Sequence, residues 1–191
     1  MNFPTIYLAS SSPRRRELLE QIEVNFSLLA VEVDEQQFEN ESPIDYVQRV
    51  ATEKAQAGWN SLTAGQHKPV LGSDTSVVLN GAALGKPKDD ADARRMLQLL
   101  SGNEHQVMTA VSIVNGDDVL CELTISTVKF ATLTEKDIDW YLSTQEGVDK
   151  AGGYAVQGLA ALFIENITGS YSAIMGLPLR ETGLLLAQLT E

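Results

Sequence analysis

Hydrophobic residues recur along the chain with the spacings of strands and of helices, and the two kinds of segment are interleaved. The predicted strands lie at 5–9, 26–31, 70–71, 75–79 and 82–84, on the arms of a hairpin that turns at 115–116 and returns to 130, and at 154–157 and 161–167. The predicted helices begin at Pro13, Ser42, 89, Thr134 and Pro178. Because hairpins stand among the helices, the pattern predicts an α/β or α+β fold with a mixed sheet.

Local residue chemistry marks several boundaries of these elements. Ser12 is a predicted N-cap with Pro13 at the first helical position, and Leu18, Leu19 and Ile22 form one face of the helix that follows. The later boundaries follow the same rules, with capping-box spacing at Ser42–Asp45, a similar pair at Thr134–Asp137, and Asn-Gly turns at 80–81 and 115–116.

Size and composition narrow the class of protein. The 191 residues can form one sizeable core without a biased linker, so we predict a single domain over 1–191. The first residues lack a secretory pattern and no stretch is long and apolar enough for a bilayer, which predicts a cytoplasmic protein without a membrane partner. The only cysteine, Cys121, lies in a strand-like run and is expected to be structural.

The charge balance argues against polymeric nucleic acid as a partner. With 14 basic and 26 acidic residues the formal net charge is −12, which opposes binding by neutralisation of many phosphates. Yet Arg14, Arg15 and Arg16 stand together in this acidic background. A local cationic pocket for a small anion fits this pattern better.

The serine and arginine run 10–15 carries the strongest chemical signal. Small hydroxyl residues let the backbone approach a ligand, and the start of a helix favours negative charge. Arg14 and Arg15 add forked donors for phosphate oxygens, although cations at this end of a helix oppose its dipole unless an anion binds. From the residues alone, a solvated basic patch with a serine cap explains the run equally well.

Other charged residues are candidates for phosphate chemistry. A carboxylate such as Asp74 or Glu35 could hold a divalent metal or take a proton from water, and Lys54 and Lys86 could balance charge on a leaving group. Each of the four, taken singly, is more often a solvated surface group. His67 and His105 lack metal-ligand spacing and are expected to be structural or solvated.

Eight segments in this order resemble the Maf family of nucleotide pyrophosphatases, and together they cover essentially the whole chain. They are LASSSPRR at 8–15, VDEQ at 33–36, ATEKA at 51–55, GSDT at 72–75, LGKP at 84–87, LSGNEHQVMTAV at 100–111, DKAGGYAVQG at 149–158 and GSYSAIMGLPL at 169–179. The resemblance implies a bilobed fold related to that of inosine triphosphate pyrophosphatases, with a central cleft and a homodimeric assembly. It also implies hydrolysis of a nucleoside triphosphate to the monophosphate and pyrophosphate, with a divalent cation, Mg²⁺ or Mn²⁺.

The same resemblance assigns roles to residues, one motif at a time. Asp74 becomes the proton acceptor, and Glu35 stands close enough to share metal binding. The phosphate end of the substrate is assigned to Ser10, Ser12, Arg14 and Arg15, and the remaining charges of the cleft to Lys54 and Lys86.

Substrate choice is expected to follow Arg14, Thr75 and Gln157, a set that resembles the branch acting on dTTP and UTP. The sister branch, which acts on 7-methyl-GTP, has tryptophan, glutamine and glutamate there. An amide such as Gln157 offers the donor and acceptor that a uracil or thymine edge needs. The alternatives are a pyrophosphatase for 7-methyl-GTP or purine triphosphates and, because the family is associated with septum formation, a sensor that restrains cell division without turnover.

Overall fold

The computed structural model describes residues 3–189, which form two compact units. Unit 1 takes the described residues of Met1–Asp74, Thr109–Thr124 and Gly176–Glu191, and unit 2 takes Thr75–Met108 and Ile125–Met175. This division agrees with the predicted bilobed organisation, whereas the central cleft and the single-domain assignment stay predictions.

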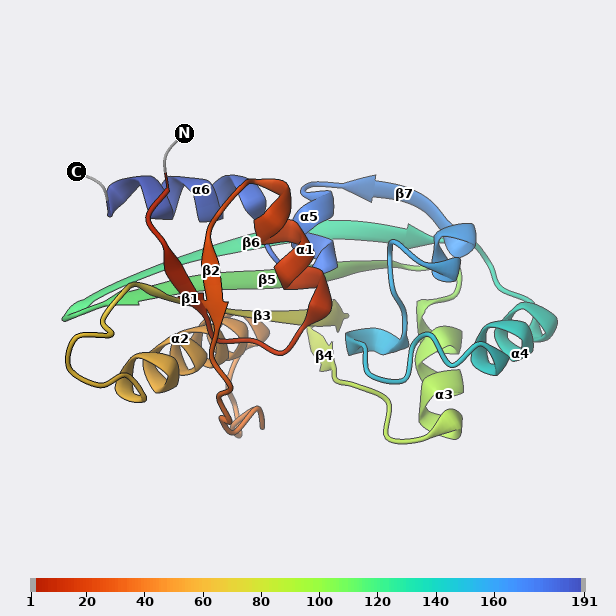
Figure 1. Ribbon diagram of the computed structural model, residues 1–191. Helices are drawn as coiled ribbons and strands as arrows, with labels where there is room; N and C mark the ends of the chain where they lie inside the picture. Colours follow the sequence, from red (N-terminus) through yellow and green to blue (C-terminus); the bar gives the residue numbers. More distant parts are fainter. Residues whose placement is uncertain (1–2, 190–191) are drawn as a thin grey trace. The chain divides into compact units, whose positions relative to one another are not determined.

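A mixed sheet underlies the fold (Figure 1). Its strand order is β2-β1-β3-β5-β6-β7, with β4 paired to β3. The pairs β1–β2 and β1–β3 are parallel, and β3–β4 and β6–β7 are antiparallel. The predicted α/β class with a mixed sheet is confirmed. The three long strands contribute to both units and are β3 (Val70–Leu79), β5 (Glu104–Asn115) and β6 (Asp118–Phe130).

Unit 1 packs helices against the parallel strands. Its other elements are β1 (Ile6–Leu8), α1 (Pro13–Gln21), β2 (Phe26–Leu28), α2 (Pro43–Asn60) and α6 (Leu179–Gln188). The fully buried side chains of Ile6, Leu8, Leu19 and Leu71 belong to its core. As predicted, α2 begins at Ser42, whose hydroxyl accepts a hydrogen bond from the backbone N–H of Asp45 at 3.2 Å.

Unit 2 contains the shorter elements and an aromatic core. Its other elements are β4 (Ala82–Leu84), α3 (Asp90–Leu100), α4 (Glu135–Ser143), the 3₁₀ turns η1 (Ala151–Gly153) and η2 (Leu159–Phe163), β7 (Ile164–Thr168) and α5 (Tyr171–Met175). The buried rings of Phe130, Tyr141, Tyr154 and Phe163 meet edge to face in its core. Within residues 3–189 no helix is both long and apolar enough to cross a bilayer.

Several sequence predictions need correction. β3 runs unbroken from Val70 to Leu79, because Gly72, Ser73 and Asp74 continue the strand instead of interrupting it. β2 ends at Leu28 and not at 31, and the short helix α5 was missed.

The remaining correction concerns 154–163. No strand forms at 154–157, and 161–167 divides between η2 and β7. Apolar residues such as Val156 are buried here without a strand. The Tyr141 hydroxyl, on α4, accepts from the backbone N–H of Ala155, and the Glu146 carboxylate accepts from that of Leu159, so these two amides are satisfied without a strand partner.

Candidate functional site

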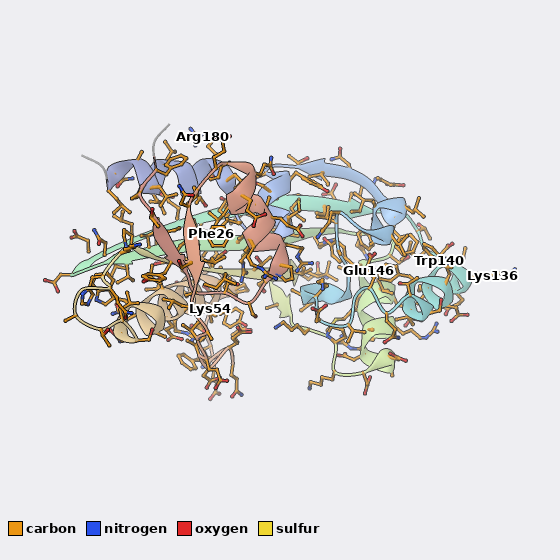
Figure 2. All side chains as sticks on the ribbon, in the orientation of Figure 1. Phe26, Lys54, Lys136, Trp140, Glu146 and Arg180 are labelled. Carbon is orange, nitrogen blue, oxygen red and sulfur yellow. The ribbon has the colours of Figure 1, made fainter. Side chains whose placement is uncertain are left out.

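Two carboxylates meet at one buried ammonium group in unit 1. Lys54 Nζ lies 2.6 Å from Glu35 Oε1 and 2.8 Å from Asp74 Oδ1. Lys54, on α2 (Figure 2), and Asp74, on β3, are 8% and 7% exposed, whereas the Glu35 side chain is 43% exposed. Removing Lys54 would leave the buried carboxylate of Asp74 without its ion-pair partner, so the charge of Asp74 depends on Lys54.

Gly72 explains why Lys54 and Asp74 can meet. A Cβ atom at Gly72 would lie 2.4 Å from the carbonyl oxygen of Ala51 and 2.6 Å from the amide nitrogen of Ala55, both in α2. Only glycine lets the helix backbone come this close to β3. Asp74 is two residues further along the same face of the strand, which directs its carboxylate toward Lys54.

The segment that carries Glu35 has no regular secondary structure, and two side chains of α2 hold it. The hydroxyl of Tyr46 donates to the carbonyl oxygen of Glu35 at 2.9 Å, and Arg49 Nη2 donates to the carbonyl oxygen of Gln36 at 2.9 Å. Burial, together with the charges of Asp74 and Glu35, raises the pKa of Tyr46 to about 12. Tyr46 and Arg49 were not predicted as supports of this segment, because helical spacing alone does not show which loop a helix face contacts.

The predicted phosphate turn is tied together by Arg15. Its Nη1 donates to Ser10 Oγ at 3.1 Å, and the backbone N–H of Ser12 donates to the same oxygen at 3.2 Å. Arg15 Nε donates to the carbonyl oxygen of Gly176 at 2.9 Å, and that oxygen also accepts from Ser73 Oγ at 3.0 Å. The start of α1, β3 and the turn before α6 therefore share one hydrogen-bond network.

The start of α1 has the features expected of a cationic anion site. Ser12 is the N-cap, as predicted, but its side chain makes no capping hydrogen bond, and the first turn contains no acidic residue. Burial lowers the pKa of Arg15 and Arg14 acts in the same direction, whereas the charges of Asp74 and Glu35 oppose them. A guanidinium stays protonated under these conditions. The predicted residues of unit 1 thus include three positive groups, Arg14, Arg15 and Lys54, and two negative ones, Glu35 and Asp74.

The predicted residues of unit 2 lie in β3 and in two loops. Thr75 is half-buried in β3, and Lys86 and Gln157 are exposed, in the loops after β4 and after η1. The backbone N–H of Gly152, in η1, donates to the carbonyl oxygen of Gly85 at 3.0 Å, which joins η1 to the loop after β4. That the predicted residues of both units converge on one polyphosphate stays a prediction.

The environments of the two histidines agree with the expectation that they are structural or solvated, and that of Cys121 agrees with a structural role. His105 is 2% exposed and bonded to Tyr154, His67 is exposed beside Trp59, and Cys121 is half-buried. Burial raises the pKa of the Cys121 thiol, which disfavours the thiolate that a nucleophile needs.

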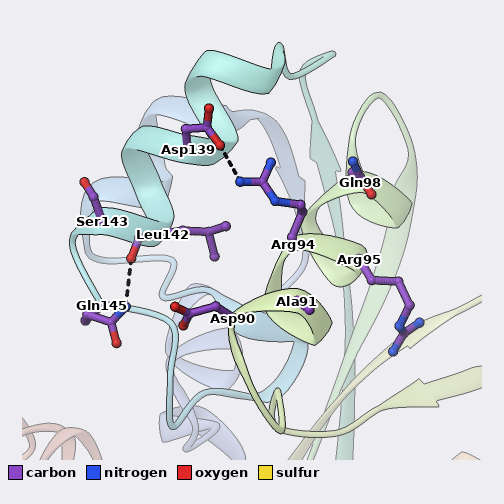
Figure 3. A pocket seen from close by; sticks show the side chains of 9 residues that line it. All are labelled: Asp90, Ala91, Arg94, Arg95, Gln98, Asp139, Leu142, Ser143 and Gln145. Carbon is purple, nitrogen blue, oxygen red and sulfur yellow. Dashed lines mark hydrogen bonds and ion pairs between the residues drawn. The ribbon is translucent and has the colours of Figure 1, made fainter.

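A polar hollow of about 460 Å³ lies elsewhere in unit 2, between α3 and α4 (Figure 3). Its arginines already have carboxylate partners, since Arg94 pairs with Asp139 and Glu135 and Arg95 pairs with Asp92. None of the predicted site residues lines the hollow. Its chemistry does not resemble a phosphate site.

The carboxylate oxygens of Glu35 and Asp74 are the type of ligand that a divalent cation prefers. Glu35 and Asp74 already share one cationic partner, and hard oxygen donors are what Mg²⁺ and Mn²⁺ prefer. Residues 3–189 contain no group of three His, Cys, Asp or Glu placed to hold a metal. A cation here would therefore take most of its ligands from substrate phosphates and water, as Mg²⁺ in nucleotide enzymes does.

Comparisons with known proteins agree over almost the full length. Residues 5–189 match the family described as "Maf-like protein". A protein of Aliivibrio fischeri named "dTTP/UTP pyrophosphatase" is 49% identical over 185 residues, covering 96% of this chain and 97% of that one. A protein of Ralstonia nicotianae with the same name is 51% identical over 194 residues, covering 97% and 94%.

One solved structure, the Staphylococcus aureus Ham1 protein, is similar at 16% identity and a TM-score of 0.44, covering 66% of this chain and 72% of that one.

Proposed function

From the premise that the chain belongs to the Maf family, we propose that it hydrolyses dTTP and UTP to the monophosphate and pyrophosphate. The relatives that carry this activity in their names match at about half of all positions and along nearly the whole length of both chains. The observation in the structure that carries the proposal is the pairing of Glu35 and Asp74 with the buried ammonium of Lys54, in the same unit as the Ser10–Arg15 turn.

The turn before α1 binds the polyphosphate. Arg15 and Arg14 supply forked donors, and Ser10 and Ser12 allow the backbone to approach the phosphate oxygens. A further positive charge from Lys86, which belongs to unit 2, stays a prediction of the family resemblance. Because the turn is already fastened through Arg15 to Gly176, little ordering is needed when the anion binds.

Asp74 accepts the proton of the attacking water. Its carboxylate is fixed on a strand and held by Lys54, so it does not need to reorganise during the reaction. Lys54 in turn stabilises the negative charge that builds up as the bond to pyrophosphate breaks. The contact between the two residues and the matching motifs support these roles.

A divalent cation completes the proposed site. Glu35 and Asp74 would hold Mg²⁺ or Mn²⁺, which supplies neutralisation of the triphosphate charge when bound. Glu35 suits this role because its side chain is half-exposed and can change partner more readily than the buried Asp74.

Base selection is assigned to Gln157 and Thr75, with Arg14 as the third position of the set. The Gln157 side chain is exposed, and its amide can donate to and accept from the edge of uracil or thymine. A glutamate at 157 would instead suit a positively charged methylated guanine. This set therefore favours dTTP and UTP over 7-methyl-GTP.

A panel of nucleoside triphosphates with Mg²⁺ or Mn²⁺ tests the proposal. We expect pyrophosphate to be released fastest from dTTP and UTP, and a preference for 7-methyl-GTP or ITP would contradict the substrate assignment. Asp74→Asn should remove turnover, whereas the control Asp117→Asn, on the exposed hairpin tip, should not. Binding of nucleotide without product release by the unaltered protein would support the sensor instead.

Two further properties belong to the proposal. We assign the protein to the cytoplasm, where the dTTP and UTP pools are, and its single cysteine agrees with a reducing compartment. The homodimer implied by the family resemblance stays a prediction, and light scattering of the purified protein measures it.

A further inference from the structure

Gln157 lies in a short loop of unit 2 whose shape does not come from a strand or a helix. The loop joins η1 to η2, and its own backbone bonds are few, with Gly158 N–H donating to the carbonyl oxygen of Ala155 at 3.1 Å. Val156 is buried, whereas the neighbouring Gln157 is exposed. The direction of Gln157 therefore depends on what holds the two ends of this loop.

The carboxylate of Glu146 holds the end of the loop that follows Gln157. Glu146 Oε2 accepts from the backbone N–H of Leu159 at 2.8 Å, and Oε1 accepts from that of Ala160 at 3.3 Å. Because these amides open η2 and have no partner within it, the carboxylate does for this turn what a capping side chain does for a helix. Glu146 lies between α4 and η1 in the sequence (Figure 2).

The end of the loop that precedes Gln157 is held by Tyr141, on α4. The Tyr141 hydroxyl donates to Glu146 Oε1 at 3.0 Å and accepts from the backbone N–H of Ala155 at 3.4 Å. Tyr141 is 1% exposed, so its ring cannot move without disturbing the core. One hydrogen-bond chain thus runs from Ala155 through Tyr141 and Glu146 to Leu159 and brackets Gln157.

Two glycines allow the close packing around Glu146. A Cβ atom at Gly158 would lie 2.3 Å from Glu146 Oε2, and a Cβ atom at Gly147 would lie 2.0 Å from the carbonyl oxygen of Gly153. The segment 146–147 therefore packs directly against the backbone on both sides of the loop. Such close packing is typical of a support that fixes geometry.

We propose that Glu146 and Tyr141 are positioning residues for base selection, because they fix the loop that presents Gln157 to the nucleobase. The inference rests on the proposed function, in which Gln157 contacts the base. It extends that function to two residues that have no contact with substrate.

The test compares hydrolysis of UTP and CTP by Glu146→Ala, Tyr141→Phe and Gln157→Ala. We expect Glu146→Ala to lower the UTP to CTP ratio of kcat/KM by about ten-fold, chiefly through KM for UTP, the size of one lost directional contact. Glu146→Gln keeps one acceptor oxygen and should restore part of the ratio. The control Glu135→Ala, an exposed carboxylate at the start of α4, should leave the ratio unchanged.

The double variant Glu146→Ala with Gln157→Ala should show no loss of selectivity beyond that of Gln157→Ala alone, since both act through one contact. Equal losses for UTP and CTP in Glu146→Ala, or losses that multiply in the double variant, would overturn the positioning role. If Gln157→Ala leaves the ratio unchanged, the failure lies with the base assignment in the proposed function.

Hydrogen exchange tests the support of the loop without an activity measurement, and so separates failure of the positioning role from failure of the base assignment. Amide exchange over 155–161 should become faster in Glu146→Ala and in Tyr141→Phe, and stay as in the unaltered protein in Glu135→Ala. If exchange does not change in the first two variants, the loop is held by something else and the inference is wrong. Tyr141→Phe keeps the ring in the core, so it remains informative should Glu146→Ala fold poorly.

Discussion

His105 should make the protein less stable as the pH falls from neutral toward 4. Its Nε2 and the Tyr154 hydroxyl form a hydrogen bond of 2.7 Å, and its Nδ1 is buried with no hydrogen-bond partner among the described residues. The rings of Phe130 and Tyr154 lie edge to face with it, at centroid distances of 5.2 and 5.5 Å. A proton on this imidazole would add a charge without solvent and a second N–H without an acceptor.

Burial accordingly lowers the pKa of His105 from 6.5 to about 4. Between pH 6.5 and about pH 4 the His105 ring binds a proton in the unfolded chain but not in the folded chain. The contribution of the neutral ring to folding stability is therefore fully present above pH 6.5 and is lost as the pH falls below it. A tenfold change in proton affinity is worth about 1.4 kcal/mol, which gives a total loss of about 3 kcal/mol by pH 4. From pH 7.5 to pH 5 the loss is about 2 kcal/mol.

Urea unfolding followed by fluorescence at pH 7.5 and pH 5 measures this loss. Carboxylates also titrate near the lower pH, and His105→Gln, which keeps a donor and an acceptor without the titrating ring, provides the background. The unaltered protein should lose about 2 kcal/mol more than the variant between the two pH values. Equal losses would refute the reasoning. NMR titration of the His105 ring, with His67→Asn to assign the two histidines, gives the folded-state pKa even if the His105 variant folds poorly.

Three further predictions follow from unit 1. Gly72→Ala should destabilise the protein by about 2 kcal/mol or more in urea unfolding, because its Cβ would meet the backbone of α2, whereas Gly85→Ala, with open space around it, should not. Arg15→Lys loses the fork that reaches Ser10 and Gly176, so KM for UTP should rise about ten-fold, with Arg16→Lys as the control; an unchanged KM contradicts the role of Arg15. Removal of divalent cations with a chelator should lower kcat at least about a hundredfold, and readdition of Mg²⁺ or Mn²⁺ should restore it; full turnover in the chelator would rule out the metal.

Local chemistry was enough to predict several elements of the fold. The capping pairs Ser42–Asp45 and Thr134–Asp137 begin helices as expected, because a cap depends on residues three positions apart. The turn at 80–81 was equally predictable, since Asn80 and Gly81 both adopt positive φ values. The second turn lies at 116–117, one residue later than predicted, because Asn115 still belongs to β5.

What the sequence could not show depends on contacts between distant segments. Gly72 was interpreted as a break in a strand, because only the packed structure shows that α2 needs its missing side chain. The segment 154–157 has the apolar pattern of a strand, but Glu146 and Tyr141 provide acceptors at both ends of it. Hydrophobic periodicity reports burial and not the partner of each backbone group.

The candidate site shows the same division. The resemblance assigned Glu35, Lys54 and Asp74 to one site, and the structure brings these three together through two ion pairs. The carbonyl group of Gly176, which joins Arg15 to Ser73, has no signal in the sequence, since any residue has a carbonyl group. Its position follows from the fold, in which Gly176 has a φ of 124° before α6.

The products formed from UTP test the central claim most directly. Purified protein is incubated with UTP and Mg²⁺ or Mn²⁺, and the phosphorus-containing products are followed over time by ³¹P NMR. A cut between the α and β phosphates gives UMP and pyrophosphate in equal amounts, which is the result we predict. Formation of UDP and inorganic phosphate, or no turnover of UTP by the unaltered protein, would contradict the account.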